Sequence, residues 1–121
     1  MAGDGLLLPV ARALGRDVPG LVLLGRLNRT GVRRLLDASH LTALTSLGFD
    51  NQPMTVVESV RAGRGVLHTD ARLTEGLDRG GLLTATPDAV GIADLLVELA
   101  LDRSLVEAAA AGARATSAVP A

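Results

Sequence analysis

The fold is decided by the stretch TSLGFDNQPMTVVESVRAGRGVLHT, residues 45–69. It predicts the end of a strand, a polar loop, a helix that begins near Pro53, a turn containing Gly63 and a second strand. Two acids, Asp50 and Glu58, stand just before and about a turn and a half inside the predicted helix. The chain concentrates polar groups in this way nowhere else, so the stretch is the candidate functional site.

Upstream of this stretch, the pattern predicts two helices and two strands. Residues 6–14 carry apolar side chains at the spacing of a helix with one buried face. The run Leu21–Leu24 is apolar without alternation, as expected of a strand covered on both faces. Thr30 is the predicted N-cap of a helix that reaches about Ser39. Leu41–Thr45 is the next predicted strand.

Downstream, two more short strands and two helices are predicted. The strands are Val66–Thr69 and Gly81–Thr84. Thr86-Pro87-Asp88 predicts a helix start, with a capping hydroxyl, a proline at the first position and an acid facing the helix dipole. The last helix is expected from Leu105 to about Ala115, and residues 105–121 comprise this terminal helix and an alanine-rich tail that frays.

Strands that alternate with helices at this spacing predict an α/β fold of the Rossmann-like type. We expect a parallel sheet of about four strands with helices on both faces. The length of 121 residues suits a single domain over 1–121. Functional groups in such sheets collect at the carboxyl ends of the strands, which directs attention to the loops after residues 24, 45 and 69.

The composition excludes several classes of function. All twelve basic residues are Arg, the net charge is -1 and Phe49 is the only aromatic residue, which argues against a nucleic-acid-binding surface. The absence of cysteine and the wide separation of His40 and His68 argue against a metal site. No apolar run approaches the ~20 residues of a membrane span, so a cytoplasmic protein without a membrane span is expected.

Asp50 and Glu58 have two interpretations from spacing alone. In the plain one, Asp50 caps the helix and Glu58 is a solvated helix residue. In the functional one, the free N–H groups at the helix start hold a phosphate or diphosphate. Arg64 and Arg72 are within reach of such a diphosphate from neighbouring loops, and a solvated role is their alternative.

A resemblance favours the functional interpretation. The segment from Phe49 to Gly65 resembles the signature of retaining, GT-B-fold glycosyltransferases of the large family 4 (group 1) type. That signature has two acids separated by seven residues, followed by a helix and a glycine turn. The family's Glu-Asn-x-Pro corresponds here to Asp50-Asn51-Gln52-Pro53.

The flanking sequence agrees with this resemblance, which extends over roughly residues 3 to 115 and is specific at 50 to 65. Four segments are similar to pieces of the family's nucleotide-sugar-binding C-terminal domain: Gly3-Asp4-Gly5, Leu23-Leu24-Gly25-Arg26-Leu27, the loop from Thr69 to Glu75, and Gly80-Gly81-Leu82-Leu83 with Pro87-Asp88.

The resemblance implies roles for individual residues. Glu58 is expected to accept hydrogen bonds from the ribose hydroxyls of a nucleotide-sugar donor, and Asp50 to face the hydroxyls of the donor's sugar. The base is expected against Gly25, Arg26 and Leu27. Asn51, Gln52, Pro53 and Met54 are expected to contact the sugar or diphosphate through the backbone amides around them. No catalytic residue, cofactor or metal is assigned.

The resemblance also implies that part of the family's domain is missing. The family has a strand, a Gly-Arg turn, a helix and another strand before the Gly-Asp-Gly, and an acceptor-binding domain before those. The chain is therefore expected to be a partial donor-binding domain, in which the strands at 21–24 and 41–45 pair directly or flank an empty slot. The alternatives are a non-catalytic nucleotide or nucleotide-sugar-binding module, an inactive truncated fragment, or a plain α/β interaction domain.

Overall fold

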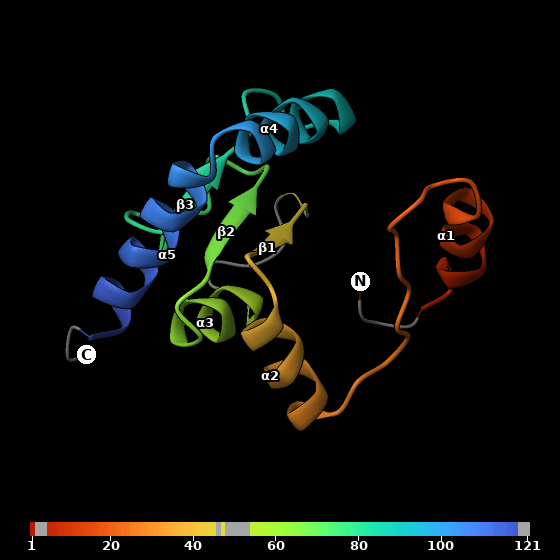
Figure 1. Ribbon diagram of the computed structural model, residues 1–121, viewed down its shortest axis with the longest axis horizontal. Helices are drawn as coiled ribbons and strands as arrows, with labels where there is room; N and C mark the ends of the chain where they lie inside the picture. Colours follow the sequence, from red (N-terminus) through yellow and green to blue (C-terminus); the bar gives the residue numbers. More distant parts are fainter. Residues whose placement is uncertain (2–4, 46, 48–53, 119–121) are drawn as a thin grey trace. The chain divides into compact units, whose positions relative to one another are not determined.

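The computed structural model describes residues 1, 5–45, 47 and 54–118 and has an α/β fold (Figure 1). Within these residues, helices and strands alternate along most of the chain, as the sequence predicts. In order, the elements are α1 (Leu8–Gly15), α2 (Arg29–Ala38), β1 (Leu41–Leu44), α3 (Met54–Arg61), β2 (Gly65–His68), β3 (Gly81–Leu83), α4 (Ala89–Leu101) and α5 (Arg103–Ala118).

The chain divides into two compact units, residues 1–35 and residues 36–121, with the division inside α2. The first unit contains α1 and most of α2. The second contains the sheet and the helices that cover it. The sheet and its surroundings are therefore a property of residues 36–121.

The three strands form a parallel Rossmann-like sheet in the order β1-β2-β3. Thr42 is opposite Val66 in the β1–β2 register, and Val66 is opposite Gly81 in the β2–β3 register. All four residues of β2 are buried, whereas those of β1 and β3 are partly buried or exposed. The middle strand therefore supplies the centre of the core.

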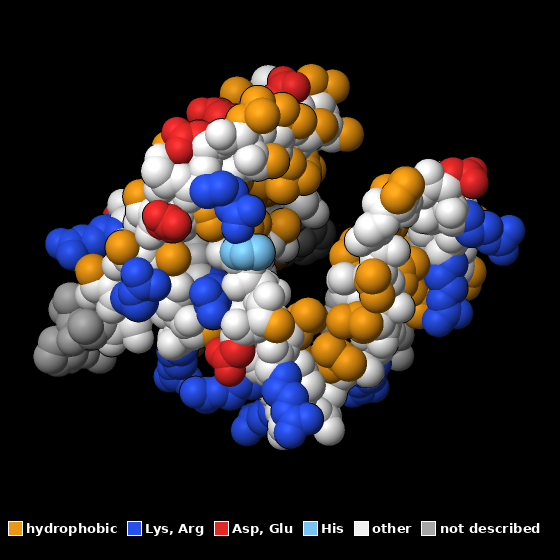
Figure 2. All heavy atoms as spheres, in the orientation of Figure 1, with side chains coloured by type: hydrophobic (Ala, Val, Ile, Leu, Met, Phe, Trp, Pro, Cys, Tyr) orange, Lys and Arg blue, Asp and Glu red, His pale blue; other side chains and the backbone are white. Residues whose placement is uncertain are grey.

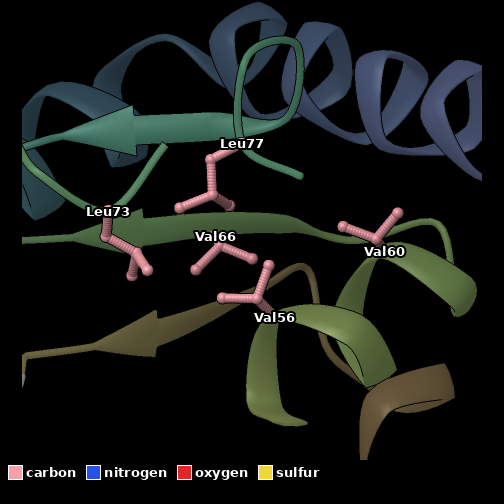
Figure 3. Close-up of a cluster of buried hydrophobic side chains, with 5 residues drawn as sticks. All are labelled: Val56, Val60, Val66, Leu73 and Leu77. Carbon is pink, nitrogen blue, oxygen red and sulfur yellow. The ribbon is translucent and has the colours of Figure 1, made fainter. Parts of the chain in front are cut away.

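The two faces of the sheet are covered by different helices. On one face, Val66 of β2 packs with Val56 and Val60 of α3, and Leu73 and Leu77 from the loop after β2 complete this cluster (Figure 3). On the other face, the next residue of β2, Leu67, packs with Leu99 of α4 and Val106 of α5. Successive side chains of a strand point to opposite faces, so β2 contributes a buried residue to both halves of the core.

Helix α5 packs closely on the backbone of Gly65 and of Arg79, because small residues stand at both contacts. A Cβ atom added at Gly65 would lie 2.6 Å from the Cβ atom of Ala109. A Cβ atom at Gly112 would collide with the carbonyl group of Arg79. These glycines permit a contact between helix and backbone that no larger residue allows without a shift.

The prediction of a strand at 21–24 is wrong. Residues 21–28 have no regular secondary structure, and the sheet has three strands rather than about four. Here the amino group of Met1 donates to the carbonyl of Val22 at 2.7 Å, and the amide of Leu24 donates to the carbonyl of Met1 at 2.7 Å. An apolar run becomes a strand only when another strand takes up its backbone groups, and no strand in the described part of the chain pairs with Leu21–Leu24.

Two predicted helix caps are displaced by two residues. The amide of Gly31 donates to the side-chain oxygen of Asn28 at 2.8 Å, so Asn28 rather than Thr30 caps α2. Asp88, rather than Thr86, is the N-cap of α4. The last helix begins at Arg103 instead of Leu105 and continues to Ala118 instead of ending near Ala115.

Candidate functional site at the carboxyl edge of the sheet

The carboxyl ends of the three strands lie at one edge of the sheet because all three run parallel. Each strand is followed directly by a threonine: Thr45 after β1, Thr69 after β2 and Thr84 after β3. In open α/β sheets, ligands bind outside this edge. It is therefore the place where the predicted site residues of unit 36–121 must be sought.

Most of the predicted sugar and phosphate contacts lie outside the described residues. This applies to Asp50, Asn51, Gln52 and Pro53. Met54 is described, as the first residue of α3, and its side chain is 64% exposed. The helix start that the sequence predicts near Pro53 is therefore confirmed to within one residue, whereas the predicted contacts of 50–53 stay predictions.

Glu58 lies on the outer side of α3, four residues after Met54. Residues four apart share a helix face, so these two side chains point the same way. Val56 and Val60 point the other way and are buried against the sheet. Glu58 is exposed. Its carboxylate is thus presented to solvent by a helix whose opposite side is anchored in the core.

A pair of hydroxyl groups fixes α3 against β1. The hydroxyl oxygen of Ser59, which is fully buried, lies 2.6 Å from the carbonyl oxygen of Thr55, to which it donates, and 2.9 Å from the hydroxyl of Thr42. A buried hydroxyl that is satisfied in this way adds specificity to an apolar contact. The position of Glu58, the neighbour of Ser59, is therefore set by polar as well as apolar contacts.

The predicted base contacts belong to the other unit, 1–35, and are described within it. Gly25 has a φ of 69°, a left-handed conformation that glycine adopts without strain. The side chain of Arg26 is exposed and that of Leu27 is partly buried. The strand predicted before Gly25 is absent, and the contacts of residues 25–27 with a base stay predictions.

Threonine hydroxyls form a chain of hydrogen bonds after β3. Thr84, which is buried, donates to the carbonyl of Thr86 at 2.7 Å, and the hydroxyl of Thr86 donates to the carboxylate of Asp88 at 2.7 Å. The same carboxylate oxygen accepts the amide of Gly91 at 2.8 Å. The bond from Thr86, followed by that from Gly91, holds the pKa of Asp88 below its usual value.

Thr69, unlike Thr84 and Thr86, has a hydroxyl group without a hydrogen bond to any described residue. Its side chain is 5% exposed. Leaving a buried hydroxyl unpaired costs free energy, so such a group marks either a weak point of the fold or a functional site. Sequence reasoning missed Thr69, because only its burial without a partner among the described residues sets it apart.

The loop after β2 is closed by an arginine and an aspartate. The guanidinium of Arg72 donates to the two carboxylate oxygens of Asp70 at 3.0 and 3.2 Å. This hydrogen bond raises the pKa of Arg72 above its usual value. His68, buried at the end of β2, has its Nδ1 atom 3.2 Å from the carbonyl oxygen of Asp70, so the same turn also covers His68.

Arg64, the other candidate for a diphosphate contact, has a structural role. Its guanidinium donates to the carbonyls of Leu36 at 3.0 Å and Asp37 at 2.9 Å, near the end of α2. Carbonyls in the last turn of a helix lack partners within the helix, and an arginine satisfies them. Arg64 immediately precedes β2 and is therefore at the amino end of the sheet, opposite the candidate site.

Searches for two other kinds of site give no candidate in the described part of the chain. No three or more of its His, Asp and Glu side chains are grouped so that they could hold a metal ion. None of its helices is both long and apolar enough to span a membrane. Comparison with known proteins adds no relative, because no protein-family model matches the chain and no curated protein matches it.

Proposed function

We propose that the chain binds a nucleotide-diphosphate sugar as the donor-binding part of a retaining, GT-B-fold glycosyltransferase of the family 4 type. The proposed reaction moves the sugar to an acceptor with retention. The observation that carries the proposal is the presentation of Glu58: an exposed carboxylate on α3, at the position where the signature that residues 49–65 resemble has its ribose-binding acid.

The chemistry of this position suits ribose. Two adjacent hydroxyl donors match the two oxygens of one carboxylate, and hydrogen bonds to a charged acceptor are stronger than those between neutral groups. In the proposal, Asp50 faces the sugar hydroxyls, and backbone amides around residues 51–54 contact the sugar or diphosphate. The start of α3 contributes free N–H groups to the phosphate.

Catalysis in this proposal rests on positioning and on stabilisation of the leaving diphosphate. It assigns no general base, metal or cofactor to the chain. An acceptor-binding domain is the implied partner. The threonine-lined carboxyl edge of the sheet, on which Thr69 and Thr84 lie, supports the proposal as the usual location of ligands in this class of sheet.

A nucleotide-binding module without catalysis is the second candidate. It is favoured by the pairing of Arg72 with Asp70, since both donor groups of the guanidinium that face Asp70 are already engaged at 3.0 and 3.2 Å. An arginine held in this way does not neutralise a leaving diphosphate unless the pair opens. The module would bind the nucleotide through Glu58 in the same manner.

Calorimetric titration of the chain with UDP and GDP tests binding. Loss of one carboxylate–hydroxyl interaction is expected to weaken binding about tenfold or more in a Glu58→Gln variant. The matched control is Glu107→Gln, which changes an exposed glutamate on α5 and is expected to leave affinity unchanged. The proposal is contradicted if neither UDP nor GDP gives heat on titration. It is also contradicted if the Glu58→Gln variant and the unchanged chain bind the nucleotide with equal affinity.

A second measurement separates the two candidates. The chain is incubated with UDP-sugars and GDP-sugars, and released nucleoside diphosphate is measured over time. Release that is abolished by Glu58→Gln and retained by Glu107→Gln favours the glycosyltransferase. Binding of the nucleotide without any release favours the binding module.

A further inference from the structure

Helix α4 has an apolar side that no described residue of unit 36–121 covers. Of its thirteen residues only Asp94 and Glu98 are charged, and its inner side is anchored by the buried Leu99. On the outer side, Val90 is 66% exposed, Val97 59% and Leu101 83%. A surface helix of a globular protein normally carries polar residues there, whereas a helix that is apolar all round is normally buried.

The exposed side chains form one continuous stripe. Val90, Val97 and Leu101 are separated by seven and four residues, which places them on the same face of the helix. Leu96, 46% exposed, widens the stripe on one flank. Figure 2 shows this apolar surface over α4. We call these four residues the α4 stripe. Contiguous apolar surface of this kind marks a site of interaction.

The charged residues of α4 and of the segments between Arg79 and Arg103 that flank it are all acidic. Between Arg79 and Arg103 the sequence contains four acids, Asp88, Asp94, Glu98 and Asp102, and no basic residue, although the whole chain has a net charge of only -1. Asp94 and Glu98 are four residues apart and therefore flank the stripe on one side as neighbours. The surface thus combines an apolar stripe with a negative border.

We propose that the α4 stripe is a docking surface for an apolar helix that carries Arg or Lys along one side. Leucine-type side chains spaced three and four residues apart would pack between those of the stripe. Two basic residues one turn apart would face Asp94 and Glu98. A basic partner is favoured over an acidic one because complementary charge steers docking and like charge opposes it.

The same charges disfavour two other occupants. A bilayer surface that contains anionic lipids attracts basic helices and repels the acids beside the stripe. A second copy that presents the same face across a two-fold axis would bring its own Asp94 and Glu98 towards those of the first. The proposal concerns a surface outside the nucleotide site and does not depend on nucleotide binding.

Two synthetic amphipathic peptides test the proposal with the full chain. Both have leucine at helical spacing; one carries Arg on its polar side, and the other carries Glu at the same positions. By fluorescence anisotropy, the chain is expected to bind the Arg peptide at least tenfold more tightly than the Glu peptide. Equal binding of the two peptides, or no binding of the Arg peptide, overturns the proposal.

Variants locate the interaction. Val97→Ser is expected to weaken binding of the Arg peptide about tenfold, because it replaces the two methyl groups of Val97 in the α4 stripe by a hydroxyl group. Its control is Val22→Ser, the same change at a valine of nearly equal exposure, 58% against 59%, in the unit 1–35. Asp94→Asn combined with Glu98→Gln is expected to abolish the preference for the Arg peptide.

Three results would contradict the proposal. The first is equal loss of binding in Val97→Ser and Val22→Ser. The second is a concentration-dependent dimer, seen by light scattering, that Val97→Ser abolishes, since this shows a second copy as the occupant. The third is binding of the chain to anionic vesicles that Val97→Ser abolishes. Circular dichroism of each variant verifies that the helix content is retained.

Discussion

The two units of the chain are built from similar apolar residues but use them differently. Among the described residues, all buried hydrophobic side chains belong to unit 36–121, from Val56 to Ala113. In unit 1–35, no described residue is fully buried, and Leu6, Leu7 and Leu14 are 99%, 73% and 74% exposed. Leucine content alone therefore does not make a core. What unit 36–121 has in addition is a sheet, whose paired strands hold apolar side chains in fixed positions on two faces.

The largest expected effect tests this difference directly. Leu67→Ala removes a fully buried side chain from the middle strand and is expected to lower the free energy of unfolding by about 3 kcal/mol. Leu24→Ala, at a site 43% exposed in unit 1–35, is expected to cost about 1 kcal/mol or less. Urea denaturation followed by circular dichroism measures both. Equal losses would show that unit 1–35 has a core of its own.

A pair of glycines sharpens the comparison. In a helix, Gly→Ala normally stabilises by about 0.5–1 kcal/mol. At Gly112 of α5 the added Cβ would collide with the backbone of Arg79, so Gly112→Ala is expected to destabilise by about 2 kcal/mol instead. At Gly5 nothing lies within 4 Å of such a Cβ, and Gly5→Ala is expected to be nearly neutral.

The sign of the Gly112→Ala effect is the informative result. Thermal denaturation of both glycine variants provides it. A stabilised Gly112→Ala variant would mean that α5 does not pack on the Arg79 backbone as closely as the structure shows, and that intrinsic helix propensity decides at this position.

Two threonines at the carboxyl edge allow a test within unit 36–121. Thr69→Val replaces an unpaired buried hydroxyl by a methyl group and is expected to raise the free energy of unfolding by about 1 kcal/mol. Thr84→Val removes the bond to the carbonyl of Thr86 and is expected to lower it by about 1 kcal/mol. Urea midpoints distinguish the opposite signs. A destabilised Thr69→Val variant would reveal a partner of this hydroxyl in solution.

The contrast between the units also explains which parts of the fold the sequence predicts. The strands at 41–44, 65–68 and 81–83 were predicted from short apolar runs. Each prediction is confirmed because the run has a neighbour in the sheet. Leu21–Leu24 has the same local pattern, but its backbone bonds to Met1. Pairing with another strand is a non-local property, and the residues of one segment do not encode it.

The candidate site was predictable to a smaller extent. The start of α3 and the outward direction of Glu58 follow from the spacing of Val56 and Val60, because residues on one helix face define the opposite one. Thr69 was missed because a threonine after a strand has no distinctive motif, and only its burial without a partner sets it apart. The caps at Asn28 and Asp88 were misplaced since several neighbouring polar residues are equally able to cap a helix.

The smallest expected effect compares the two helix caps. Asn28 of α2 and Asp88 of α4 each accept the amide of the glycine three residues later at 2.8 Å, but only Asp88 titrates. Its pKa is lowered in the folded chain, mainly by the Thr86 hydroxyl, so the unfolded chain binds the proton more tightly. The stabilisation is therefore complete above the usual carboxyl pKa and is lost as the pH falls through the lowered pKa of the folded state.

Asp88→Asn keeps an acceptor oxygen at the cap but removes this titration. The melting temperature of the unchanged chain is expected to exceed that of Asp88→Asn at pH 7, and the difference is expected to shrink as the pH falls below the usual carboxyl range. Asn28→Ser, which exchanges one uncharged cap for another, is expected to give a difference that does not vary over the same pH range. If the Asp88→Asn difference is also constant with pH, then Asp88 stabilises α4 through its shape as a hydrogen-bond acceptor, and its charge contributes nothing.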